Sequence, residues 1–183
     1  MSSVNDVQNH IKSAFEKDRH ISPCLTSTIA EVFYVDDSTK QCVLFERVDN
    51  EKNLLKILNP NRKEITLFAI DGCFIGKSMP PEHCDCIFFD DATFCFAELK
   101  FESITIKELT IETNRVKAVN QLRSTFKIFD TAFNRDFLGL KLEAYVCTPD
   151  HYPSKGSTLD RFVIEFLEDF GMLLFERNEK TFT

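Results

Sequence analysis

Features that identify several common protein classes are missing from this sequence of 183 residues. No apolar run approaches the roughly 20 residues that a membrane-spanning helix needs, so we expect a soluble protein with no membrane contact. No signal peptide is recognisable and the 7 cysteines are odd in number, so we expect a cytoplasmic protein with reduced thiols. Tryptophan is absent as well, and 19 phenylalanines supply aromatic volume to the core.

Positive charge is also in short supply. The chain carries 22 lysines and arginines against 29 acidic residues, which gives a net charge of −7. Proteins that coat nucleic acid are usually basic, because phosphate neutralisation supplies most of their nonspecific affinity. The balance therefore argues against a simple coating module. It is compatible with an enzyme that clusters acids around a metal ion, or with a chain to which a partner delivers the substrate.

Two familiar ligand motifs are incomplete. His83, Cys84 and Cys86 resemble part of a zinc site, but the sequence has no second C-x-x-C pair, so we expect the two cysteines to be small buried residues. Residues 72–78 (GCFIGKS) resemble a phosphate-binding loop, but Met79 and the prolines after it exclude the helix that such a loop requires. The sequence therefore predicts neither zinc nor nucleotide binding.

The apolar pattern predicts one α/β domain that spans residues 1–183. Helices are expected at 4–17, 113–133 and 157–170, the last of them stopped by Gly171. Strands are expected at 41–48, 63–75, 140–148 and 172–176, one or two helical turns at 51–58, turns at 36–38 and 71–72, and either a helix or a strand at 26–35. This order is a mixed α/β pattern in which a mixed central sheet is flanked by helices.

The stretch 84–101 (CDCIFFDDATFCFAELKF) is predicted to form a hairpin of two apolar strands joined by an acidic turn. Asp85, Glu98 and Lys100 are out of place in such a hairpin. Side chains alternate along a strand, so Glu98 and Lys100 share one face. With a bend centred between residues 90 and 91, Asp85 opposes Phe96 and lies diagonal to Glu98, roughly 7–8 Å away. A bend longer by one residue would move Asp85 to the other face.

The three charged residues have a chemical interpretation. Both faces of the expected hairpin are apolar, as in a sheet covered on both sides, so charges there need a partner or a ligand. Mg²⁺ and Mn²⁺ prefer oxygen ligands, and one or two carboxylates typically bind Mg²⁺. We therefore expect Asp85 and Glu98 to bind the ion and Lys100 to orient or deprotonate a water that attacks a phosphodiester. The alternative is a solvent-facing side of the hairpin, where charges are routine.

The spacing of these residues resembles a known family pattern. Asp85 lies near the start of one expected strand, and residues 98–100 (ELK) lie on the next. Residues 121–126 (QLRSTF) on the following helix are similar to a Q-x-x-x-(Y/F) element, with Phe126 one position late. The chain between about residues 80 and 150 thus resembles the PD-(D/E)XK nuclease superfamily in its RecB-like branch, although Cys84 replaces the proline of the family name.

The resemblance implies a restriction-endonuclease-like core and an endonuclease that depends on Mg²⁺ or Mn²⁺. The substrate would be nucleic acid, DNA in preference to RNA. Family habit further implies a component of prokaryotic antiviral defence or DNA processing. A homodimer or a larger complex with a partner protein would also fit, because cutting both strands of a duplex needs two sites.

The resemblance also implies residue roles. Asp85, Glu98 and Lys100 would be catalytic, the two acids would bind the metal, and Gln121 would position the substrate. Three more residues are weaker candidates: Arg115 and Lys117 for substrate positioning on the basic helix from residue 113, and Glu31 as an extra acid from an early helix. For these three, an ordinary solvated surface is the more common outcome.

Two alternatives remain open. The first is a binding protein that keeps the same fold with an idle site and serves as an inhibitor, an immunity-type partner or a scaffold. Net acidity and small size favour it, while the intact set of Asp85, Glu98 and Lys100 disfavours it. The second is a structural α/β protein whose hairpin charges are a coincidence.

Overall fold

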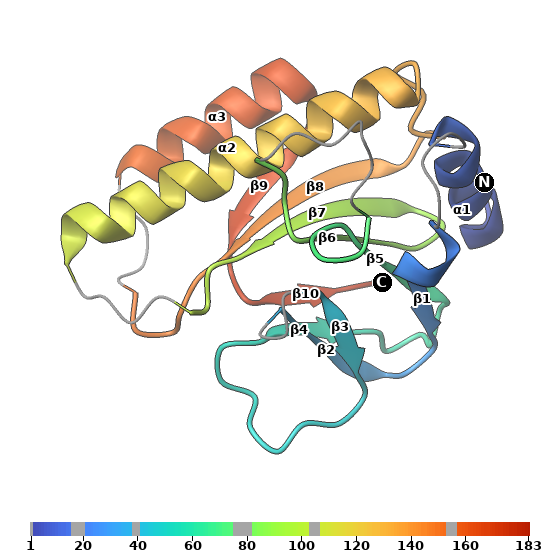
Figure 1. The fold of residues 1–183 in the computed structure, drawn as a ribbon, viewed down its shortest axis with the longest axis horizontal. Helices are drawn as coiled ribbons and strands as arrows, with labels where there is room; N and C mark the ends of the chain where they lie inside the picture. The colour runs from blue at the N-terminus through green and yellow to red at the C-terminus, as the bar shows by residue number, and fades with distance from the viewer. Residues whose placement is uncertain (1, 16–20, 38–40, 75–81, 103–106, 153–156) are drawn as a thin grey trace.

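The chain folds into three layers, which are a layer of helices, a six-stranded sheet and a four-stranded sheet (Figure 1). The computed structural model describes residues 2–15, 21–37, 41–74, 82–102, 107–152 and 157–183. Its helices are α1 (Val4–Ala14), α2 (Glu108–Ala132) and α3 (Ser157–Phe170), with a short 3₁₀ helix at Ser22–Cys24. Its strands are β1 (Leu25–Thr28), β2 (Val32–Asp36), β3 (Val43–Phe45), β4 (Leu55–Leu58), β5 (Ile65–Ala69), β6 (Cys86–Phe89), β7 (Thr93–Leu99), β8 (Lys141–Cys147), β9 (Leu173–Glu176) and β10 (Glu179–Thr181).

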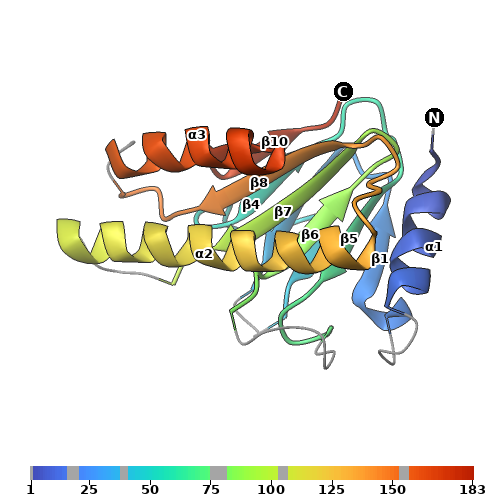
Figure 2. The ribbon, with the colours of Figure 1, turned by 90° about the horizontal axis from the view of Figure 1, so that it is seen from above.

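The larger sheet has the strand order β1-β5-β6-β7-β8-β9. Its pairs are antiparallel from β1 to β7 and parallel from β7 to β9. Parallel neighbours require a crossover connection, and α2 and α3 supply it between β7 and β8 and between β8 and β9. The two crossover helices lie side by side on one face of the sheet (Figure 2). The expected mixed sheet with flanking helices is confirmed.

The smaller sheet has the order β10-β4-β2-β3, and its residues pack against the other face of the larger sheet. From the sequence, helices were expected to flank the central sheet, and this second sheet was not predicted. The strand β10 completes it by pairing in parallel with β4. The end of the chain therefore returns to a sheet whose other strands come from its first third (Figure 1).

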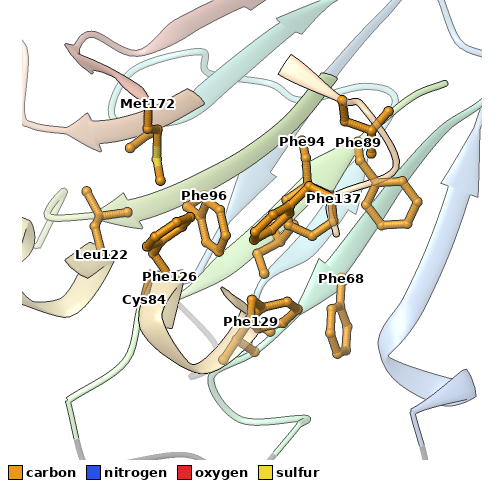
Figure 3. Packing of buried hydrophobic residues seen from close by; sticks show 14 of the residues in the cluster. Phe68, Cys84, Phe89, Phe94, Phe96, Leu122, Phe126, Phe129, Phe137 and Met172 are labelled. Atoms are coloured by element: carbon orange, nitrogen blue, oxygen red, sulfur yellow. The ribbon is translucent and has the colours of Figure 1, made fainter. Parts of the chain in front are cut away.

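Two apolar clusters fill the spaces between the layers. One lies between the helices and the larger sheet and includes Phe94, Phe96 and Phe129 (Figure 3). The other lies between the two sheets and includes Phe88 and Tyr145. The strands β6 and β7 are consequently buried on both faces, which explains why the sequence of the hairpin is apolar on both.

The ends of two helices follow from local sequence. The side chain of Ser3 accepts a hydrogen bond from the N–H of Asp6, whose carboxylate accepts the N–H of Ser3, and this capping box starts α1. Gly171 ends α3 with a φ of 63°, a conformation that glycine adopts without strain. None of the helices within the described ranges is long and apolar enough to cross a membrane.

Local expectations fail where neighbouring strands override the sequence pattern. Residues 51–58 were expected to form helical turns, but Leu55–Leu58 is the strand β4. Leu55 and Ile57 are fully buried between the sheets, and this alternation suits a strand covered on one face. The ambiguous stretch 26–35 lies mostly in the strands β1 and β2 and contains no helix.

The cysteines are not all reduced, contrary to the sequence-based expectation. Cys24 and Cys73 form a disulfide across a sequence separation of 49 residues. Pairing of β1 with β5 brings the two residues together, because Cys24 directly precedes β1 and Cys73 lies in the turn after β5. The free cysteines are all buried: Cys42, Cys84, Cys86, Cys95 and Cys147.

Candidate active site

The turn of the hairpin that carries the candidate site lies one residue further along the chain than expected. Phe96 opposes Ile87, whereas the sequence analysis paired it with Asp85. The side chain of Asp90 closes the turn by accepting hydrogen bonds from two backbone N–H groups, at 2.9 and 2.7 Å. The register is therefore displaced by an even number of residues, which preserves the alternation of faces. If the same register continues one residue beyond the pair Cys86 and Ala97, Asp85 lies directly opposite Glu98 and not diagonal to it.

Asp85 is held by the backbone of both neighbouring strands. Its Oδ2 accepts a hydrogen bond from the N–H of Leu99 at 2.5 Å, and its carbonyl oxygen accepts the N–H groups of Ile70 and Asp71, both at 3.0 Å. Burial raises the pKa of Asp85 to about 6, although the Leu99 N–H and the charge of Lys100 act in the opposite direction. The carboxylate is therefore fixed in place and still ionises below neutral pH.

Glu98 is completely buried, and only one of its two carboxylate oxygens is satisfied. The Nζ of Lys100 donates a hydrogen bond to Oε1, whereas Oε2 has no hydrogen-bond partner among the residues that the structure describes. Burial and then the charge of Asp85 raise the pKa of Glu98 well above its usual range. A buried carboxylate oxygen without a partner costs stability, so a cation near this atom would be strongly stabilising.

The helix α2 fixes the other side of the site. Gln121 accepts a hydrogen bond from Lys100 Nζ through Oε1 and donates one from Nε2 to the carbonyl oxygen of His83, both at 2.9 Å. One turn further along, Thr125 Oγ1 donates to the carbonyl of Gln121 and accepts the N–H of Cys84 at 2.8 Å. These bonds attach α2 to the chain that leads into β6, and so set the position of the lysine relative to the acids.

These side chains open onto a cavity of about 600 Å³. The lining residues are Asp37, Asp71, Asp85, Glu98, Leu99, Lys100, Glu102, Thr110, Asn114 and Gln121. Acids dominate this wall, and Lys100 supplies its positive charge. The structure therefore brings together, in one cavity, the four residues to which the sequence analysis gave a central role: Asp85, Glu98, Lys100 and Gln121.

Two residues proposed for substrate positioning have different surroundings. Arg115 is only 2% exposed, and its guanidinium donates to Glu176 at 2.7 Å and to Glu112 at 2.6 Å. The pair with Glu176 joins α2 to β9, and the pair with Glu112 lies within α2. Together they account for the side chain without a substrate, so Arg115 is not assigned a positioning role. Lys117 is exposed, and helical geometry puts it on the same stripe of α2 as Asn114 and Gln121 in the cavity wall.

Glu31 does not come from a helix, because it lies in the bend between β1 and β2. Its exposed carboxylate pairs with Arg62 at 3.3 Å. The cavity instead receives acids that the sequence analysis had placed only in turns, Asp37 after β2 and Asp71 after β5. Each of the two directly or closely follows an apolar strand. Acids in ordinary turns also follow apolar strands, so this position in the sequence could not have identified Asp37 and Asp71 as cavity residues.

The acids of the cavity offer a limited set of ligands for a divalent ion. Within the described ranges, no group of three or more histidine, cysteine, aspartate or glutamate side chains is arranged to hold a metal. Mg²⁺ nevertheless needs only one or two carboxylates, since water and substrate complete its coordination. Asp85 and Glu98 fit that requirement, because both line the cavity and the described part of the chain offers no hydrogen-bond partner to the buried Glu98 Oε2.

Comparisons with known proteins add no assignment. No protein-family model matches the chain, and no match was found among curated proteins or solved structures. The geometry and charge of the residues that line the cavity therefore provide the evidence for its role.

Proposed function

We propose that the protein is a metal-dependent nuclease that hydrolyses phosphodiester bonds of nucleic acid, with DNA preferred over RNA. One observation carries the proposal. The buried Glu98 has an oxygen without a hydrogen-bond partner among the described residues, in a cavity that it shares with Asp85, Lys100 and Gln121. Burying two carboxylates beside each other costs free energy, and a role in binding a cation accounts for that cost.

Asp85 and Glu98 would hold Mg²⁺ or Mn²⁺. When bound, the ion would polarise the phosphate and lower the pKa of a coordinated water. Lys100 Nζ lies beside Glu98 and Gln121, where it would orient the attacking water and offset negative charge that develops on the scissile phosphate. Gln121 would hold this ammonium in place, and Lys117 would contact a phosphate further along α2.

We extend the proposal to the fold and its setting. The strands β5 to β9 with α2 and α3 would form a restriction-endonuclease-like core, with the acids on the β6–β7 hairpin and Gln121 on the helix that follows it. A role in prokaryotic antiviral defence or DNA processing, as a homodimer or with a partner protein, would follow from this family. The support for this extension is the spacing of Asp85, Glu98, Lys100 and Gln121 in sequence.

A cleavage assay tests the activity. Purified wild type, Glu98→Ala, Lys100→Ala and Glu31→Ala are incubated with single- and double-stranded DNA and RNA, with Mg²⁺, with Mn²⁺ or with EDTA. We expect cleavage that requires metal, and a loss of about 100-fold or more in the first two variants. Glu31→Ala should cleave at the wild-type rate, because its side chain is exposed and does not line the cavity. Equal residual cleavage in every sample would indicate a contaminant and contradict the proposal.

The second candidate is a binding protein with an idle site. The contact of Lys100 with Glu98, together with the missing group of three metal ligands among the described residues, favours it. A lysine that neutralises the buried glutamate could serve stability alone. A wild-type protein that neither binds Mn²⁺ nor cleaves nucleic acid would favour this candidate over the nuclease.

A further inference from the structure

Two neighbouring acids at the end of β2 face different surroundings. Asp36 is the last residue of the strand and lines a hollow of about 760 Å³ on the outer side of the smaller sheet, with Tyr34 and Phe45. Asp37 follows it and lines the cavity that contains Asp85 and Glu98. Successive side chains of an extended chain point in opposite directions, so two adjacent aspartates serve two separate surfaces.

Asp37 shares the cavity with Asp85 and Glu98, and it is itself only partly exposed. Burial and then the charge of Asp85 raise the pKa of Asp37 to about 7, and Asp37 is in turn among the groups that raise the pKa of Glu98. Such repulsion acts over short distances, in agreement with the single cavity that all three carboxylates line. Separately, Glu98 is buried and its Oε2 has no partner within the described part of the chain. Both observations indicate a place where a cation is stabilised.

The remaining acids of the cavity, Asp71 and Glu102, are less suited to stabilise a bound cation. Asp71 lies 3.3 Å from the His83 ring and is about half exposed, and its Oδ1 accepts the N–H of Gly72. Glu102 is exposed at the rim. Exposed charges are screened by water and salt, so their effect on a bound ion is small.

We infer that Asp37, contributed by the smaller sheet, increases the affinity of the Asp85 and Glu98 site for a divalent cation through its negative charge, without being a ligand of the ion. The inference rests on the proposed function, since it assumes that Asp85 and Glu98 bind the ion. It makes the site a product of both sheets. The smaller sheet then has a role in ion binding in addition to its role in covering the core.

Calorimetric titration with Mn²⁺ at pH 8 tests the inference without any assay of cleavage. We compare wild type, Asp37→Asn, the adjacent Asp36→Asn, and Asp85→Asn. Removing the charge of Asp37 should lower Mn²⁺ affinity about 10- to 100-fold, as is typical when a supporting group of a metal site is lost. Asp36→Asn removes an equal charge one residue away on the other surface and should leave the affinity unchanged. Asp37→Glu, which keeps the charge, should retain most of the affinity.

The outcomes separate the inference from the proposed function. If Asp85→Asn abolishes Mn²⁺ binding while Asp37→Asn binds like the wild type, the inference is wrong and the proposed function stands. If Asp36→Asn and Asp37→Asn weaken binding equally, the effect is general electrostatics and the inference is likewise overturned. If the wild type binds no Mn²⁺, the proposed function fails and the inference fails with it. Thermal melting in EDTA establishes that each variant is folded.

Discussion

Lys100 Nζ lies 2.9 Å from Oε1 of Gln121, so a residue of α2 holds the lysine that directly follows β7. Gln121 is uncharged, and its Nε2 donates a hydrogen bond to the carbonyl oxygen of His83. The two bonds make it a link between α2, Lys100 and the chain that leads into β6. If the nuclease proposal is right, the position of the ammonium depends on this link.

Gln121→Ala should therefore slow cleavage by about 10- to 100-fold while Mn²⁺ affinity stays near that of the wild type, because both acids are intact. Single-turnover kinetics and calorimetry measure the two quantities separately. Asn120→Ala is the matched control, since Asn120 is the exposed neighbour on α2. A Gln121→Ala variant that cleaves at the wild-type rate would exclude a positioning role for this residue.

The two cations near the start of α2 should behave differently. Arg115→Met leaves the buried carboxylate of Glu176 without its partner, and removing one member of a buried ion pair costs about 3–5 kcal/mol. Lys117→Ala should leave the free energy of unfolding nearly unchanged, and should weaken nucleic-acid binding and reduce its salt dependence by about one phosphate contact. Urea unfolding and titrations at several salt concentrations test this. A salt dependence that Lys117→Ala does not alter would remove Lys117 from the proposed substrate track.

The acid cluster should make the metal-free protein less stable as the pH rises. The pKa of Asp85 is raised to about 6 and that of Asp37 to about 7, so the folded state holds these protons more tightly than the unfolded chain does. The stabilisation is complete below the unfolded pKa near 4 and is lost as the pH rises through the folded values. In EDTA, the melting temperature should therefore fall by at least about 3 °C between pH 5 and pH 8.

Two controls accompany the pH experiment. Asp85→Asn should flatten the profile, because the side chain no longer titrates. Saturating Mn²⁺ should raise the melting temperature most at pH 8, where the carboxylates are ionised and bind the ion. A melting temperature that rises steadily from pH 5 to pH 8 in EDTA would contradict the arrangement of charges described above.

The disulfide should be detectable chemically and should contribute to stability. Alkylation of the unfolded, unreduced protein should modify five cysteines, and all seven after reduction. Because the bond between Cys24 and Cys73 closes a long loop, its reduction should lower the free energy of unfolding by about 2–4 kcal/mol. Urea unfolding with and without a phosphine reductant measures the loss. The double variant Cys24→Ser, Cys73→Ser should show no response to the reductant.

Glu143 should be a major stabilising residue away from the cavity. It accepts hydrogen bonds from Lys180 of β10 at 2.6 Å and from Tyr145 at 2.7 Å, and Lys141 lies 2.7 Å away. Burial alone would raise the pKa of Glu143, but Lys141, Lys180 and Tyr145 together lower it to about 2. Its contribution is therefore present above the unfolded pKa near 4.5 and is lost as the pH falls toward 2.

Glu143→Gln should lower the free energy of unfolding by about 3 kcal/mol at pH 7, since it leaves the nearly buried Lys180 without its charge partner. Lys141→Met is the control. The side chain of Lys141 is more than half exposed, so its loss should cost less than about 1 kcal/mol. Equal losses in the two variants would show that Glu143 does not join the two sheets through Lys180.

Local sequence was sufficient for much of the fold. The capping box at Ser3, the apolar stripe of α2 and Gly171 after α3 act over a few residues, and the three predicted long helices are present. The hairpin was predictable for the same reason. Its observed register differs from the expected one by an even number of residues, so each side chain lies on the expected face of the sheet. Asp85 and Glu98 therefore line the same cavity.

Pairing between distant segments decided what the sequence pattern could not. The strand β4 depends on β2 and on β10, which is more than 100 residues away, and Arg115 is buried because Glu176 lies across from it. A pattern within a short segment of sequence does not reveal that β10 pairs with β4 or that Glu176 pairs with Arg115. The same reason explains why Asp37 was read as an ordinary turn residue.

The sequence by itself determined the α/β class, the main helices and the β6–β7 hairpin with its three charged residues, because caps, periodicity and strand alternation act between near neighbours. Only the tertiary structure decided that a second sheet covers the hairpin, that Cys24 meets Cys73, and that Asp37 reaches the cavity. Those outcomes depend on which distant strands pair and which buried charges come together, and long-range packing alone sets both.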